Sequence, residues 1–85
     1  MDNEYSDLCE LIVDQKYEVR KQALMLILQY AQTEQDRKNF AHTNLVFNLT
    51  KLLGEEDVMT SVLSVIIQFA IDDFYQEQFV RLHTL

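Results

Sequence analysis

The 85-residue chain contains no proline, no tryptophan, one glycine and one cysteine. Tight hairpin turns depend on glycine and proline, so helices joined by polar turns are favoured over a β-rich fold. The single glycine, Gly54, follows the leucine-rich stretch 45–53 and can end a helix there, because glycine readily takes a positive φ. The lone Cys9 cannot form a disulfide within the chain, which suits a reducing compartment.

Basic residues are also scarce, since 7 lysines and arginines face 14 acidic residues and leave a net charge of -7. This charge would repel nucleic-acid phosphates and anionic lipid surfaces, so we expect neither as a partner. The N-terminal segment MDNEYSDLCE is acidic where a secretory signal would be basic and then apolar. We expect a soluble protein of the cytoplasm or the nucleus. The basic pairs Arg20-Lys21 and Arg37-Lys38 are each flanked by acids and are expected on solvated helix faces.

What the chain does contain is one stretch that occurs twice. The segment EVRKQALMLILQYA at 18–31 recurs as DVMTSVLSVIIQFA at 57–70, a shift of 39 residues that superposes Leu24 on Leu63 and Gln29 on Gln68. A period of this length is typical of α-helical repeats, in which each unit buries its apolar face against its neighbours. We therefore predict one all-α domain, 1–85, that consists of a partial repeat at 6–32, a full repeat at 33–71 and the start of another at 72–85.

Capping residues and apolar spacing predict five to six helices in this domain. Ser6 and Thr33 can cap helices because a hydroxyl accepts hydrogen bonds from the free N–H groups of a first turn. Asp72-Asp73 is expected to serve as the cap and turn before the last helix. Phe40 and Phe79, which are 39 residues apart, are predicted to point inward. The expected helices are 6–14, 18–32, a short helix of about two turns after residue 33, 45–53, 55–71 and 74–83.

In this order the elements resemble armadillo repeats. The segment 33–70 is similar to one complete repeat, with a short polar helix, TEQDRKNFAHT, a helix with paired leucines and a glycine, NLVFNLTKLLG, and a long third helix, EEDVMTSVLSVIIQFA. Glu18-Val19-Arg20 with Ala23-Leu24 also resembles the related HEAT repeats. The resemblance implies a right-handed α-α superhelix of the armadillo-like type, an α solenoid of about two repeats.

In armadillo proteins the third helices line a concave groove, where a regularly placed asparagine holds an extended peptide backbone. The matching positions here are Gln29 and Gln68, whose amides offer the donors and the acceptor that such a backbone requires. Met25 and Ser64 stand one turn earlier, where carriers of basic nuclear-import peptides often have tryptophan. The resemblance thus implies a non-enzymatic interaction module or scaffold that binds a protein or peptide partner through Gln22, Met25, Gln29, Ser64 and Gln68.

The same residues allow other interpretations. Each glutamine could bond to a neighbouring turn or face water, and Met25, Leu26, Tyr30 and Phe69 could belong to the core or form an apolar groove. Apolar surface at an open end of the stack could pair two copies of the chain as a homodimer. The leucine-rich helix before Val-Arg-x-x-Ala-Leu also resembles the N-terminal region of the armadillo-like chaperones of translation elongation factor two. That second resemblance implies a co-chaperone as the alternative function.

The sequence offers no pattern typical of a catalytic or metal site. Cys9 lies beside Asp7 and Glu10, which would keep its thiol protonated. His42 and His83 have no spaced cysteine or histidine partners, and a single glycine cannot form a phosphate-binding loop. We therefore expect no enzymatic activity, no cofactor and no metal.

Overall fold

The computed structural model describes residues 4–82, and all regular secondary structure in this range is helical. The predicted all-α class is therefore confirmed for these residues. The six α-helices are α1 (Glu4–Leu11), α2 (Tyr17–Tyr30), α3 (Glu34–Asn39), α4 (Leu45–Leu52), α5 (Met59–Phe69) and α6 (Asp73–Arg81), and a 3-10 turn, η1 (Glu56–Val58), precedes α5.

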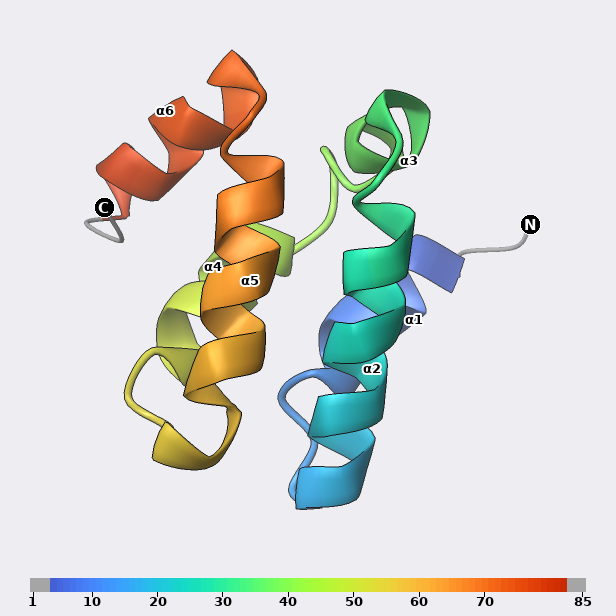
Figure 1. The fold of residues 1–85 in the computed structure, drawn as a ribbon, viewed down its shortest axis with the longest axis vertical. Helices are drawn as coiled ribbons and strands as arrows, with labels where there is room; N and C mark the ends of the chain where they lie inside the picture. Colours follow the sequence, from blue (N-terminus) through green and yellow to red (C-terminus); the bar gives the residue numbers. More distant parts are fainter. Residues whose placement is uncertain (1–3, 83–85) are drawn as a thin grey trace.

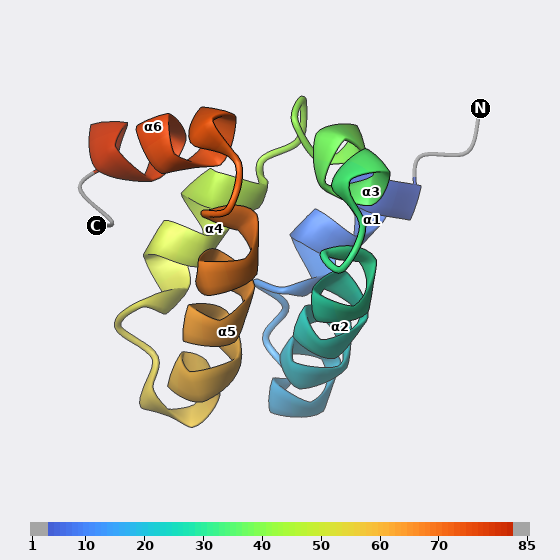
Figure 2. The ribbon, with the colours of Figure 1, turned by 45° about the horizontal axis from the view of Figure 1, so that its top comes forward.

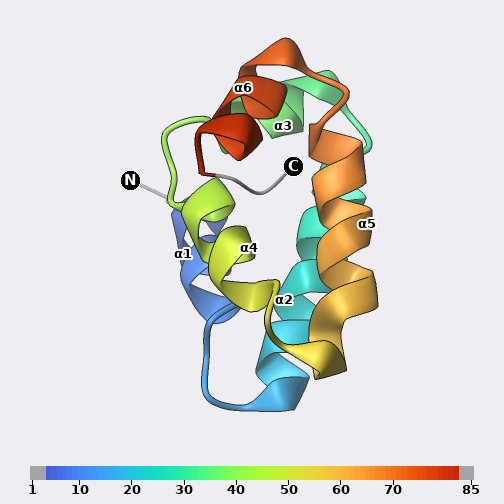
Figure 3. The same ribbon diagram turned by 90° about the vertical axis from the view of Figure 1, so that its left-hand side faces the viewer.

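The helices form two layers and a cover at one end. α2 and α5 pack side by side and run in the same direction (Figure 1). α1 and α4 pack behind them as the second layer, as Figure 3 shows. The short helices α3 and α6 lie across the same end of the two layers (Figure 2). The molecule is consequently flat, with extents of 32 × 31 × 18 Å.

The core lies between the two layers and beneath α3 and α6. Leucine, isoleucine and valine side chains fill most of it, as the apolar spacing of the helices requires. A series of edge-to-face aromatic contacts joins α1, α3, α5 and α6, with ring-centroid distances of 4.9 Å for Tyr5–Phe40, 5.6 Å for Phe40–Phe69 and 4.8 Å for Phe69–Tyr75. Phe40 and Phe79 are both buried, so the prediction that they point inward is confirmed.

The first helix differs from the prediction at both ends. It begins at Glu4 and ends at Leu11, so Ser6 lies inside the helix and does not cap it. Tertiary contacts explain the earlier start, because Tyr5 packs against Phe40 and the Tyr30 hydroxyl donates a hydrogen bond to Glu4. In the turn that follows, Asp14 Oδ1 accepts a 2.8 Å hydrogen bond from the backbone N–H of Lys16.

Thr33 caps α3 as predicted, with its hydroxyl accepting from the backbone N–H of Asp36 at 3.3 Å. Asp72 holds the corresponding position before α6, but its side chain makes no capping bond and is bound by Arg37 instead. The last helix ends at Arg81, and the predicted terminus at His83 lies outside the described residues. Gly54 follows α4 as expected, although its φ lies outside the left-handed region.

Candidate partner-binding surface

The five predicted partner-binding residues lie on two parallel helices. Gln22, Met25 and Gln29 are spaced by three and four residues on α2, and Ser64 and Gln68 are spaced by four on α5, so each set shares one side of its helix. α2 and α5 run side by side in the same direction (Figure 1), and Met25 and Gln29 on α2 match Ser64 and Gln68 on α5 at the 39-residue shift. We call these five residues the glutamine face.

Most of the glutamine face is open to solvent. Gln22 and Gln29 are exposed, Met25 is 49% exposed, and Gln68 is half-buried. The Ser64 hydroxyl donates to the carbonyl oxygen of Thr60 at 3.0 Å. Within residues 4–82 the amides of Gln29 and Gln68 bond to no other residue, which leaves their donors and acceptors for water or for a partner.

An apolar hollow of about 260 Å³ lies beside this face, between α1 and α2. Gln22 is the one glutamine-face residue at its rim, and the rest of the lining is Leu8, Leu11, Glu18, Val19, Ala23 and Leu26. We call it the α1–α2 hollow. Met25, Leu26, Tyr30 and Phe69 were expected either in the core or in an apolar groove. Phe69 is fully buried in the core and Tyr30 packs against it half-buried, so only Leu26 of the four lines this hollow.

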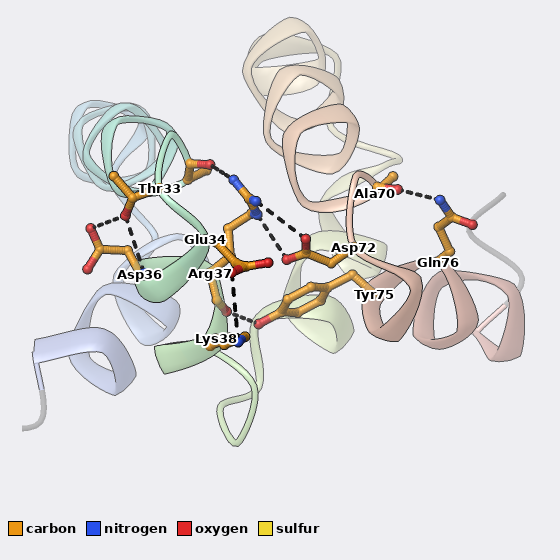
Figure 4. A network of polar contacts seen from close by, with 10 residues as sticks. Thr33, Glu34, Asp36, Arg37, Lys38, Ala70, Asp72, Tyr75 and Gln76 are labelled. Atoms are coloured by element: carbon orange, nitrogen blue, oxygen red, sulfur yellow. Dashed lines mark hydrogen bonds and ion pairs between the residues drawn. The ribbon is translucent and has the colours of Figure 1, made fainter.

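Sequence reasoning missed the polar junction around Arg37, which Figure 4 shows. Arg37 is only 7% exposed, although we predicted a solvated side chain. Its Nη1 donates to the carbonyl oxygen of Ala31 at 2.8 Å, and its Nε and Nη2 donate to the two carboxylate oxygens of Asp72 at 2.9 and 3.3 Å. The Tyr75 hydroxyl donates to the carbonyl oxygen of Arg37 at 2.5 Å. Lys38, by contrast, is exposed as predicted.

The 39-residue correspondence held a signal for this junction. Arg37 aligns with Gln76, and each follows by six residues an alanine at the end of a long helix. Gln76 Nε2 donates to the carbonyl oxygen of Ala70 at 2.7 Å, just as Arg37 donates to that of Ala31 (Figure 4). Both side chains thereby satisfy a carbonyl that the end of a helix leaves without an intrahelical partner.

In the basic pair Arg20-Lys21, the arginine also departs from the prediction of a solvated side chain. The Arg20 side chain is 12% exposed and forms a 2.7 Å ion pair with Asp57 just before α5. Its Nη1 also donates to the carbonyl oxygens of Asp14 and Gln15 at 3.0 and 3.1 Å. Arg20 therefore ties the turn after α1 to η1, while Lys21 is exposed as predicted.

Among residues 4–82, the pKa values of Tyr5, Cys9, Tyr30 and Tyr75 are raised. Burial raises the pKa of the Cys9 thiol from 9.0 to about 11, helped by the negative charge of Glu10, while a hydrogen bond to Thr43 acts the other way. The hydrogen bond to Glu4 and partial burial raise the pKa of Tyr30 to about 12. The Cys9 thiol is consequently protonated at neutral pH, a poor state for a nucleophile. Among residues 4–82, no three histidine, cysteine or acidic side chains are grouped to hold a metal.

No protein-family model, curated protein or solved structure matches this chain. The armadillo or HEAT relationship and the co-chaperone alternative therefore stay predictions. None of the helices within residues 4–82 is long and apolar enough to cross a membrane.

Proposed function

We propose that this chain is a non-enzymatic protein-interaction module, built as about two armadillo-like repeats of a right-handed α-α superhelix, that binds an extended peptide or protein segment along its glutamine face. The observation that carries the proposal is the pairing of Gln29 and Gln68. Neither amide bonds to another residue of the described range 4–82, and the two stand at equivalent positions on parallel helices that pack together. The repeat arrangement is supported by the matching bonds from Arg37 and Gln76 to the alanines that end α2 and α5.

The spacing of the two amides suits an extended backbone. Packed helices have axes roughly 8–10 Å apart, and an extended chain advances about 3.3 Å per residue. A segment that crosses α2 and α5 would therefore meet one glutamine about every third residue. Each amide can donate to a backbone carbonyl and accept from a backbone N–H, so it holds the peptide independently of its side chains. The net charge of -7 favours a neutral or basic segment.

A peptide selected from a random library against the parent protein tests the proposal. We expect the double variant Gln29→Ala/Gln68→Ala to bind it at least about fivefold more weakly, because each lost hydrogen bond is worth about 0.5–1.5 kcal/mol. In a nitrogen-15 NMR titration of the parent, the side-chain amide signals of Gln29 and Gln68 should move with the bound fraction.

The matched control is Gln15→Ala/Gln35→Ala, which removes two exposed glutamines that lie away from the glutamine face. It should bind the peptide as the parent does. Circular dichroism of both double variants checks that the helices are retained. Parent-like affinity in the Gln29→Ala/Gln68→Ala protein, with its helices intact, would show that the glutamine face is not the binding surface.

A further inference from the structure

The α1–α2 hollow has an exact counterpart inside the molecule. The α2 residues of the hollow correspond to residues 39 positions later, on η1 and α5. Its α1 residues correspond to residues 41 positions later, on α4. The counterparts of its apolar residues are all buried. Leu11 is 41% exposed but its counterpart Leu52 only 3%, and Leu26 is 44% exposed but its counterpart Val65 is 0% exposed. The matched pairs are Leu8 with Leu49, Leu11 with Leu52, Val19 with Val58, Ala23 with Val62 and Leu26 with Val65.

The opposite difference occurs on the other side of the long helices. Leu24 on α2 is fully buried, whereas its counterpart Leu63 on α5 is 45% exposed. Leu28 is half-buried, and its counterpart Ile67 is 65% exposed. The two helices match in sequence, so their neighbours account for the difference. Because α2 and α5 pack together, we take the positions buried only in α2 to lie against α5 and those buried only in α5 to lie against α2.

Each end of the stack therefore presents one half of the internal α2–α5 interface. The α1–α2 hollow corresponds to the half that α5 contributes, and the Leu63–Ile67 side of α5 corresponds to the half that α2 contributes. We propose that the α1–α2 hollow binds the Leu63–Ile67 side of a second copy of this chain. The contact is head to tail. A dimer therefore keeps one unoccupied hollow at one end and one unoccupied Leu63–Ile67 side at the other, and further copies can bind there to form a linear oligomer. The inference rests on the repeat arrangement proposed above, and its surface shares only Gln22 with the glutamine face.

Several polar links of the internal interface lack a counterpart between copies, and two of them involve residues beside the hollow. The ion pair of Arg20 with Asp57 would become Met59 of one copy opposite Glu18 of the next. Asn48, which donates to the carbonyl oxygen of Cys9 at 2.8 Å, is replaced by Asp7, whose ionised carboxylate has no proton to donate. The contact between copies is therefore weaker than the internal interface. Substituting Met59→Arg or Asp7→Asn should restore one link each.

Sedimentation equilibrium of two charge variants tests the head-to-tail geometry. Leu26→Glu blocks the hollow and Ile67→Glu blocks the opposite side, and both positions are exposed enough for the variants to fold. We expect the average mass of the parent to rise with concentration, and each variant alone to stay monomeric, with association weakened at least about tenfold by an unpaired charge at an apolar contact. An equimolar mixture of the two should form one-to-one dimers and nothing larger, because one intact half remains on each protein.

Met25→Glu is the matched control, since Met25 neighbours Leu26, is 49% exposed and does not line the hollow. It should associate as the parent does. Met59→Arg should tighten association about two- to fivefold, and Glu18→Gln should cancel that gain. Association of either charge variant alone would overturn the head-to-tail contact, as would a parent and a Met59→Arg/Asp7→Asn protein that both stay monomeric. The Leu26→Glu variant should still bind the selected peptide. A failure of the self-association proposal can therefore be told apart from a failure of the proposed peptide binding.

Discussion

The connection between α2 and α3 and the connection between α5 and α6, which we call the two corners, share one hydrogen-bond pattern. They differ in the number of polar contacts that stabilise them. At both corners a side chain six residues beyond an alanine donates to that alanine's carbonyl oxygen, Arg37 at 2.8 Å and Gln76 at 2.7 Å. Arg37 is buried and also binds Asp72, which precedes α6, whereas Gln76 is exposed. An amide suffices where the corner lies at the edge of the molecule. A guanidinium, with more donors, can also hold the next helix in place.

The long helices show the same contrast in their apolar residues. Leu24 and Leu63 occupy the same place in the 39-residue period, yet the first is fully buried and the second is 45% exposed. The period thus decides which side of a helix is apolar. Whether that side is covered depends on whether another helix lies against it.

The largest expected change in stability distinguishes Arg37 at the first corner from Gln76 at the second. Arg37→Ala should lower the free energy of unfolding by about 3 to 5 kcal/mol, because it leaves the half-buried Asp72 carboxylate and the Ala31 carbonyl without their partner. Gln76→Ala should cost about 1 kcal/mol or less, since water can replace an exposed amide. Urea denaturation followed by circular dichroism measures both. Equal losses would mean that the two corners are held alike, and Arg37→Gln should fall between them.

The two leucines provide the next comparison. Leu24→Ala should destabilise the protein by about 3 kcal/mol, because it removes buried methyl groups and leaves a cavity. Leu63→Ala should change stability by about 0.5 kcal/mol or less at low protein concentration, since that side chain is half in water already. The same urea titration applies. A large loss for Leu63→Ala in the monomer would contradict the contrast drawn between the two helices.

The smallest expected effect concerns Cys9, whose thiol on α1 donates to the Thr43 hydroxyl just before α4 at 3.3 Å. Its pKa is raised from 9.0 to about 11, so the native state holds this proton more tightly than the unfolded chain does. The resulting stability is fully present below pH 9 and is lost as the pH rises to about 11, by up to about 2 kcal/mol.

Cys9→Ala should flatten this alkaline decline, and urea titrations at several pH values between about 8 and 11 would show it. Tyrosines such as Tyr30, whose pKa is raised to about 12, contribute at higher pH in both proteins. Below about pH 10, where tyrosines stay protonated, the difference between the variant and the parent reports the thiol. Identical pH dependence in the two proteins would show that the Cys9 thiol does not contribute.

The residue pattern predicted those parts of the structure that depend on interactions within a few turns. The spacing of apolar residues placed the helices, and Thr33 capped α3 through its own first turn. Phe40, directly after α3, and Phe79, within α6, both faced inward. The glutamine face follows from the same local geometry, since residues three and four positions apart share a side of a helix.

The tertiary structure alone decided which charges were buried and which apolar sides stayed open. Arg37 meets Asp72 across 35 positions and Arg20 meets Asp57 across 37, so neither pair could be found from flanking residues. The early start of α1 likewise depends on Tyr5 reaching Phe40 in another helix. The physical reason is range: helix formation and capping use groups within about one turn, whereas ion pairing and burial require that distant helices come together.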